Sequence, residues 1–172
     1  MARAWEVNGL AANARFRDAA GRIVLTRWRE TMSYREGTLA GEDIEELHAM
    51  RVSSRRLRAA MDAFVDVFPA RSFRRYLREV KRITDTLGDA RDLDVAIDHL
   101  TVLLPDLEPI DRPGLEGLID RYEQQRRAED AQIHALFIRL EQEAFGARFE
   151  AWVATHTGID ADELQPGPSG TH

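Results

Sequence analysis

Basic side chains crowd the stretch from His48 to Arg91, although the whole chain has a formal net charge of -6. This stretch holds ten arginines and Lys81 against five acidic residues, which gives it a charge of +6. A local field whose sign opposes that of the whole protein favours an anionic ligand. Guanidinium groups donate paired, charge-assisted hydrogen bonds to phosphate oxygens. The sequence therefore predicts an anion-binding surface in this segment.

The basic residues are spaced so that they share one face on each of two consecutive helices. At 100° per residue, the first helix places His48, Arg51, Arg55 and Arg58 together, away from an apolar stripe. The second helix has a stripe opposite its own apolar side, formed by Arg71, Arg74, Arg75, Arg78, Lys81 and Arg82. Like charges one turn apart destabilise a helix by about 0.2–0.5 kcal/mol per pair. Such stripes therefore need either acidic partners elsewhere in the fold or an anionic ligand, and charge alone leaves both open.

Other interpretations of these residues are weighed beside this one. A charged helix side is ordinarily a solvated face. A metal site at His48 would need a second ligand three or four residues later, where an arginine and a valine stand, so we expect no metal there. Asp89, Asp92 and Asp94 could form a Mg²⁺ cluster. Capping of the predicted 89–103 helix and pairing with arginines, such as Arg91 or those of the 43–68 helix, are the favoured roles for these three carboxylates.

Catalysis on phosphoanhydrides would need a metal or a general base near the basic face, and the same three carboxylates are the candidates. The sequence contains no phosphate-binding glycine loop and no nucleophile motif, so we expect no enzymatic activity and no cofactor. Single-strand nucleic-acid binders interleave aromatic and basic residues. Here Phe64, Phe73 and Tyr76 fall on the core faces, which favours a phosphate chain over nucleic acid. A scaffold without any ligand is the remaining alternative.

The elements that must position these residues are helices, because the apolar spacing is helical nearly everywhere and no strand is expected. We expect an all-α antiparallel bundle of about six helices, over residues 10–34, 43–68, 70–87, 89–103, 115–141 and 145–153, with a turn over 37–41. Asp43 is expected to cap its helix, with Glu46 as capping-box partner. Gly88 is expected to end one helix and Asp89 to cap the next. In the first helix the apolar side comprises Phe16, Ile23, Val24 and Trp28.

Two charged residues, Arg126 and Glu129, stand on the apolar stripe of the predicted 115–141 helix. A buried charge is costly unless it is paired. Either the helix projects from the bundle at this point or Arg126 reaches a polar centre. We favour the second interpretation and include Arg126 among the candidate ligand residues.

Composition bounds the class of protein. The 172 residues, 44% hydrophobic and 31% charged, suit one soluble globular domain with a core. The absence of cysteine excludes disulfides and thiolate metal sites, and it fits a cytoplasmic location. We expect no signal peptide, and no apolar run approaches the roughly 20 residues of a membrane span. A single domain over 1–156 and a disordered tail over 157–172 are expected.

Two blocks of the basic segment resemble the CHAD family, the conserved histidine α-helical domain. They read HAMRVSSRRLRAAM over 48–61 and VKRITDTLGDARDLDV over 80–95, and the resemblance extends over about residues 10–155. It implies an all-helical fold and binding of inorganic polyphosphate through a basic cavity. Phosphate or sulfate ions are the alternative ligands that we expect. Carried over by position, the resemblance implies ligand contacts from His48, Arg51, Arg55, Arg56, Lys81 and Arg91. The second choices among the stripe residues are Arg58, Arg74, Arg75, Arg78 and Arg82.

The sequence departs from the family in one respect. Members usually carry two similar helical halves, each with an H-x-x-R helix, whereas this chain resembles a single half. His134 does not provide the second copy. We therefore expect a homodimer whose two-fold symmetry replaces the internal pseudo-symmetry of the family. The resemblance also implies association with polyphosphate granules.

Overall fold

The computed structural model describes residues 3–10 and 13–160, and these residues form an all-helical fold without strands. The elements are α1 (Phe16–Ser33), α2 (Arg35–Ala40), α3 (Ile44–Ala63), the short 3-10 turn η1 (Val65–Val67), α4 (Ala70–Leu103), the 3-10 turn η2 (Leu104–Asp106), α5 (Arg112–Gln142) and α6 (Phe145–Thr157). The predicted fold class is confirmed.

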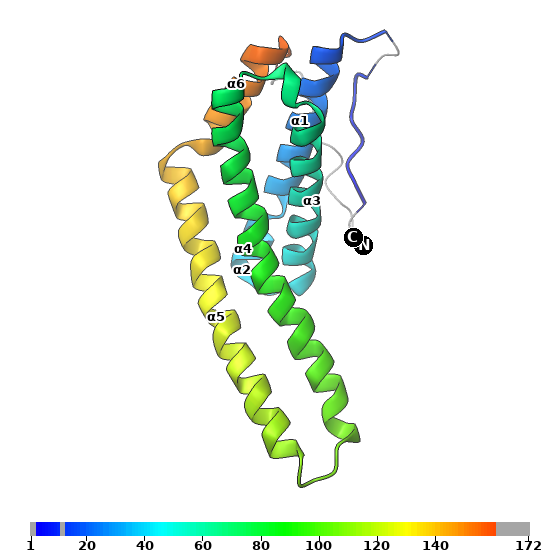
Figure 1. Cartoon of the computed structure of the whole chain (residues 1–172), viewed down its shortest axis with the longest axis vertical. Coiled ribbons are helices and arrows are strands. Elements are labelled where there is room, and N and C mark those ends of the chain that lie inside the picture. Colours follow the sequence, from blue (N-terminus) through cyan, green and yellow to red (C-terminus); the bar gives the residue numbers. More distant parts are fainter. Residues whose placement is uncertain (1–2, 11–12, 161–172) are drawn as a thin grey trace.

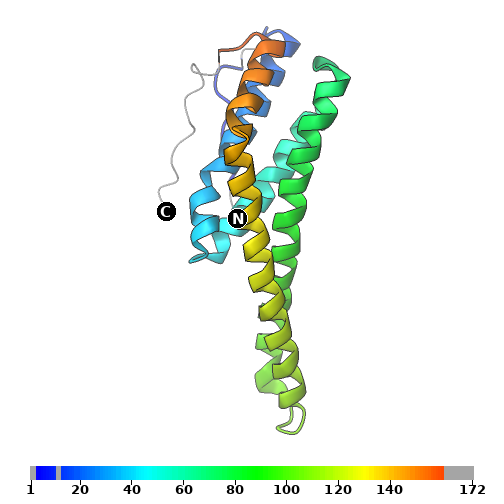
Figure 2. The ribbon, with the colours of Figure 1, turned by 90° about the vertical axis from the view of Figure 1, so that its left-hand side faces the viewer.

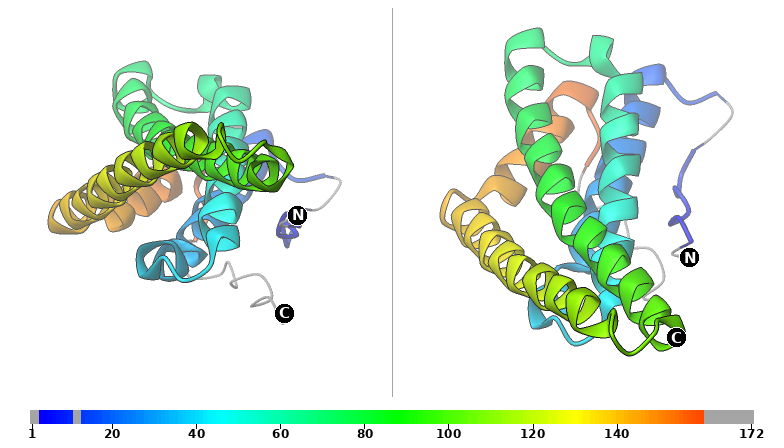
Figure 3. Two further views of the ribbon diagram at one scale, coloured as in Figure 1. Left: turned by 90° about the horizontal axis from the view of Figure 1, so that it is seen from below. Right: turned by 60° about the horizontal axis from the view of Figure 1, so that its bottom comes forward.

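The molecule has two parts of different thickness. In the upper part of Figure 1, α1, α3, α4 and α6 pack into a bundle, and in the lower part α4 and α5 continue together as a two-helix projection. We call residues 91–132 of this projection the α4–α5 hairpin. Figure 3 shows α4 between α3 and α5. The central position of α4 places one of its sides against the helix that carries His48.

The core follows from the apolar stripes of the sequence. The apolar side of the predicted 70–87 helix is buried, and it consists of Phe73, Tyr76, Leu77, Val80, Ile83 and Leu87. An aromatic cluster closes the bundle end near α6, where the rings of Tyr76 and Trp152 stack with centroids 4.5 Å apart. Phe16 was expected on the apolar side of the first helix, yet it is 63% exposed. It is the first residue of α1, at the edge of the bundle, and its ring contacts that of Phe64 alone among the described rings.

The expected break at Gly88 is wrong, because α4 runs without interruption from Ala70 to Leu103. A glycine inside a helix costs about 1 kcal/mol relative to alanine. Burial of the neighbouring Leu87 and Ala90 outweighs that cost. Asp89 is consequently an exposed residue in mid-helix and caps nothing. The expected turn over 37–41 is largely the short helix α2, which Gly41 ends in the left-handed conformation at φ +67°.

The helix that carries His48 begins where the sequence predicts. The side chain of Asp43 accepts a hydrogen bond from the backbone N–H of Glu45 at 2.8 Å. At the other end of the chain, order extends past residue 156, because Thr157 belongs to α6 and Ile159 is buried in the core. Residues 161–172 of the expected tail lie outside the described residues. Among the helices that are described, none has the length and apolar character that crossing a membrane requires.

Candidate anion-binding site

The contacts of Arg51 show how α3 and α4 are aligned. Its Nε would lie 3.6 Å from a Cβ placed on Gly88, and its Nη2 lies 3.6 Å from Oδ1 of Asp92. The guanidinium group of Arg51 therefore rests on α4 between these two residues. Because the short η1 turn connects the two helices in opposite directions, later residues of α3 lie beside earlier residues of α4.

This alignment gathers cations from both helices on one side. On α4, Lys81, Arg74 and Arg78 project within about 60° of the direction of Gly88 and Asp92. We call the combined surface the α3–α4 basic face, and it consists of His48, Arg51, Arg55, Arg58, Arg74, Arg78 and Lys81. The structure thus brings together most of the site residues that the sequence predicts.

Little of the positive charge on this face is neutralised by the protein. Among the described residues, no carboxylate lies within ion-pair distance of Arg55, Arg74, Arg78 or Lys81. Arg58 reaches Asp62 only at 4.0 Å, and both side chains are about half exposed. Exposed pairs of this kind contribute about 0–1 kcal/mol. Apart from the ion pair between Arg51 and Asp92, the positions of these cations are therefore set by the folded helices and not by ion pairs.

His48 and Arg51 carry unmet hydrogen-bonding capacity. Nδ1 of His48 and Nε of Arg51 are both buried without a hydrogen-bond partner. In contrast, Nδ1 of His134 and of His156 each contact the backbone carbonyl four residues earlier, at 2.8 and 2.7 Å. A buried polar atom without a partner costs about 1–3 kcal/mol. His48 and Arg51 are one helical turn apart, so this end of the face holds two unfavourable buried atoms. The stability of the fold alone does not explain their positions.

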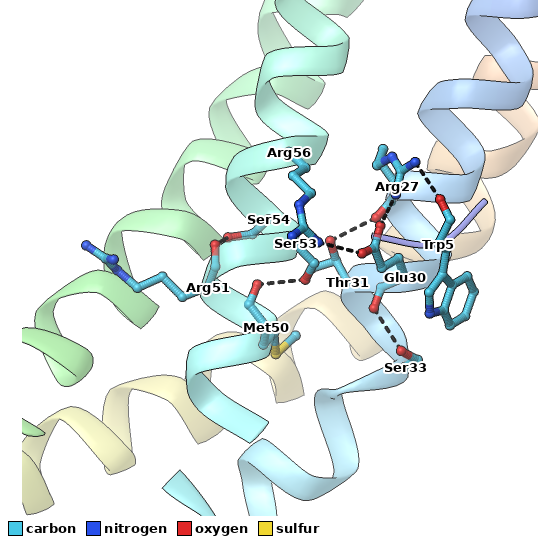
Figure 4. Close-up of polar contacts among 10 residues, drawn as sticks. All are labelled: Trp5, Arg27, Glu30, Thr31, Ser33, Met50, Arg51, Ser53, Ser54 and Arg56. Carbon is cyan, nitrogen blue, oxygen red and sulfur yellow. Dashed lines mark hydrogen bonds and ion pairs between the residues drawn. The ribbon is translucent and has the colours of Figure 1, made fainter. Parts of the chain in front are cut away.

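Arg56 lies on the other side of α3 from Arg51, as Figure 4 shows. Its Nη1 donates to Oε1 of Glu30 at 2.8 Å, and Glu30 is fully buried. Arg27 donates to the other oxygen of Glu30 and, at 2.7 Å, to the backbone carbonyl of Trp5. Sequence reasoning missed this centre. Arg56 therefore lies outside the α3–α4 basic face, and its role as a ligand contact stays a prediction.

Three further candidates also lie apart from the face. Arg91 is half-buried, in nearly the direction of Val80 around α4, and makes no ion pair with a described carboxylate. Arg82 lies 3.6 Å from Glu79. Arg75, a second choice, has its guanidinium 6.0 Å from the ring centroid of Tyr76.

Both alternatives considered for Arg126 hold: the helix projects from the bundle at this point, and Arg126 reaches a polar centre within the hairpin. Its Nε donates to Asp94 at 2.6 Å and its Nη1 donates to Asp130. Burial works to lower the pKa of Arg126, but the hydrogen bonds to Asp130 and Asp94 outweigh it and raise that pKa above its ordinary value. Arg126 thus joins α4 to α5 as a paired cation.

The three carboxylates considered as a Mg²⁺ cluster point in different directions around α4. Asp94 binds Arg126, Asp92 lies near Arg51, and Asp89 is exposed. Within residues 3–10 and 13–160, no three His, Asp or Glu side chains converge as metal ligands. The predicted pairing with an arginine of the 43–68 helix is confirmed by Asp92, which lies 3.6 Å from Arg51.

A pocket of about 230 Å³ lies elsewhere, between α1, α5 and α6. Trp28, Met32, Phe137 and other apolar residues line it, and an ion pair of 2.7 Å between Arg35 and Glu141 borders it. It contains none of the predicted site residues. The residues that line this pocket come from helices far apart in the sequence, so no local spacing of residues predicts the pocket.

Comparisons with known proteins relate the chain to one family. The family model described as CHAD domain matches residues 22–169. The crystal structure of the CHAD domain from the plant Ricinus communis is similar, with a TM-score of 0.65 and 27% identity, over 96% of this chain and 53% of that chain. The chain thus spans about half the length of that plant protein chain. No curated protein matches it. Together with the arrangement of α3 and α4, the family match shows that the chain belongs to the CHAD domain family.

Proposed function

We propose that the protein binds inorganic polyphosphate along the α3–α4 basic face, without catalysis. The observation that carries this proposal is the set of four cations without carboxylate partners, Arg55, Arg74, Arg78 and Lys81, on one side of two packed helices. The CHAD family is associated with proteins related to polyphosphate and triphosphate, which supports the same ligand.

A phosphate chain suits this face because both are linear arrays of charge. Successive turns of a helix are about 5.4 Å apart, so Arg74, Arg78 and Lys81 present cations at intervals that a flexible polyanion can follow. Arginine adds charge-assisted hydrogen bonds to phosphate oxygens, and lysine adds a compact charge. His48 and Arg51 extend the row toward the α4–α5 hairpin.

The aromatic residues favour polyphosphate over single-stranded nucleic acid. Base stacking contributes about 1–3 kcal/mol per base and needs exposed rings beside the basic residues. Phe73 and Tyr76 are buried, and Phe64 packs against Phe16. None of the residues that define the face is Phe, Tyr or Trp, which favours interactions directed at phosphate.

The carboxylates at the face favour binding without catalysis. A general base must lie within hydrogen-bond reach of the nucleophile that it activates. Asp85 and Asp92 are exposed residues of α4 on this side, and Asp92 is engaged with Arg51. We assign them the role of adjusting the charge of the face. A cytoplasmic location at polyphosphate granules belongs to the same proposal.

A binding titration with polyphosphate of defined chain length tests the proposal. The test variant replaces Arg51, Arg55 and Lys81 with Gln. The matched control replaces Arg3, Arg15 and Arg127, whose side chains are 93%, 86% and 66% exposed and lie outside the face. We expect the test variant to lose at least about tenfold in affinity while its Tm holds or rises, since like-charge repulsion is relieved. The control should keep its affinity.

Two outcomes would overturn the proposal. Equal losses in the two variants would show that only net charge matters. A lower Tm with unchanged affinity in the test variant would assign the face a structural role. Single-stranded RNA of matched charge serves as competitor, and equal affinity for RNA would contradict the preference for polyphosphate. Release of phosphate on addition of Mg²⁺ would contradict the absence of catalysis.

A further inference from the structure

The α4–α5 hairpin lacks a core of its own. Between Ala90 and Ile133, no hydrophobic residue is buried, although this stretch is described throughout. Several of its large apolar side chains are well exposed: Val95 at 37%, Val102 at 66%, Leu103 at 52% and Ile110 at 87%. Helices gain most of their stability from packing an apolar face against other elements. The hairpin, which projects beyond the bundle in Figure 2, therefore presents an uncovered packing surface.

The exposed valines continue the side of α4 that α3 covers. Val95 follows Leu77 by 18 residues and Val102 follows Thr84 by the same spacing, which is five full turns of a helix. Leu77 and Thr84 are buried in the bundle, on nearly the side of α4 where Arg51 rests on Gly88.

Helix α3 does not extend over these valines. It begins at Ile44, seven residues before Arg51 and 47% exposed. The apolar side of α4 that packs against α3 therefore continues into the hairpin. Because α3 begins only at Ile44, it does not cover this continuation.

The distribution of charge indicates which partner covers the apolar side of the hairpin. Between Val95 and Gln125 the chain has seven acidic residues and two arginines, so the hairpin is as clearly negative as the segment from His48 to Arg91 is positive. One chain thus carries an acidic, partly apolar hairpin and a basic face that ends at its base. Complementary potentials on two surfaces of the same molecule favour association between copies of that molecule.

We propose that a second copy of the chain covers the hairpin. The two hairpins pack side by side in opposite directions, as a four-helix arrangement with a two-fold axis. In that arrangement the acidic tip of each hairpin approaches the His48 and Arg51 end of the partner's α3–α4 basic face. The apolar stripes supply the contact area, and the charges set the antiparallel direction. This assembly does not depend on polyphosphate.

Light scattering and sedimentation equilibrium on the full chain test the assembly. We expect the wild-type protein to have twice its chain mass of 19.6 kDa at micromolar concentration. Replacing Val102 and Leu103 with Ser should give a monomer with unchanged helical circular dichroism, since both residues are already exposed in one copy. The control Ile138→Ser changes a residue that is 54% exposed on α5 outside the hairpin, and it should remain dimeric.

The outcomes separate this assembly from its alternatives. A wild-type protein that stays monomeric at about 100 µM, or a control that dissociates as readily as the hairpin variant, overturns the proposal. Raising NaCl from about 50 to about 500 mM should weaken the dimer several-fold, because the tip and the basic face attract through solvent. A dimer whose dissociation constant does not change with salt overturns the antiparallel arrangement.

Discussion

Arg56 binds the fully buried carboxylate of Glu30 across the contact between α1 and α3, with its Nη1 2.8 Å from Oε1. Arg27 binds the other oxygen and donates to the carbonyl of Trp5 (Figure 4). Glu30 therefore links α1, α3 and the N-terminal segment. Arg55, the neighbour of Arg56 in the chain, is exposed, belongs to the α3–α4 basic face and makes no ion pair among the described residues.

These neighbours should respond to mutation in opposite ways. Arg56→Ala removes one partner of a buried carboxylate, so we expect the free energy of unfolding to fall by about 2–4 kcal/mol. Arg55→Ala should change it by less than about 0.5 kcal/mol and should lower the affinity for polyphosphate. Denaturant titration and binding measurements on both variants check this. A destabilised Arg55→Ala with normal binding would contradict the assignment of the two residues.

The sequence predicts which side of each helix is buried, because burial follows the 3.6-residue period of the apolar residues. Phe73, Val80 and Leu87 show this for α4, and the same period places Arg51 and Arg55 together on α3. The partner of a charged residue follows no such local rule. Glu30 lies 26 residues before Arg56, so only the packing of α1 on α3 brings the two together.

The continuity of α4 could not be read from sequence for a related reason. Glycine followed by aspartate is a typical signal for a helix end and a new cap. That local preference is worth about 1 kcal/mol, whereas burial of a Leu side chain such as Leu87 contributes about 1.5–3 kcal/mol. The free energy of burial is the larger of the two, and it can be judged only when the positions of α3 and α5 are known.

Gly88→Ala should therefore stabilise the protein. Its new Cβ would lie 3.6 Å from Nε of Arg51, an ordinary contact, and alanine favours the helix by about 0.5–1 kcal/mol. Gly88→Leu should instead displace Arg51 and lower the affinity for polyphosphate. Gly117→Leu is the control, since no atom lies within 4 Å of a Cβ at that position. Loss of stability in Gly88→Ala would show that the helix does break there.

Arg126 should hold the base of the hairpin together. Arg126→Ala leaves the nearly buried Asp94 without its cation, so we expect a loss of about 1–3 kcal/mol in local stability. Backbone amides between Asp94 and Arg126 should exchange with solvent faster, while those of α1 should not change. Arg127→Ala removes an exposed pair with Glu123, 3.9 Å long, and should have little effect. Equal exchange in the two variants would contradict the role of Arg126.

Tyr34 should make the protein less stable at alkaline pH. Burial raises the pKa of Tyr34, and the charges of Glu30 and Glu46 raise it further against the opposing effect of Arg56. The folded state therefore holds the phenol proton more tightly than the unfolded state, whose pKa is near 10.0. The resulting stability is complete below that pH and is lost as pH rises through the folded-state pKa. Tm measured up to about pH 11 should fall less steeply in Tyr34→Phe than in the wild type. Identical slopes in Tyr34→Phe and in the wild type would contradict the prediction.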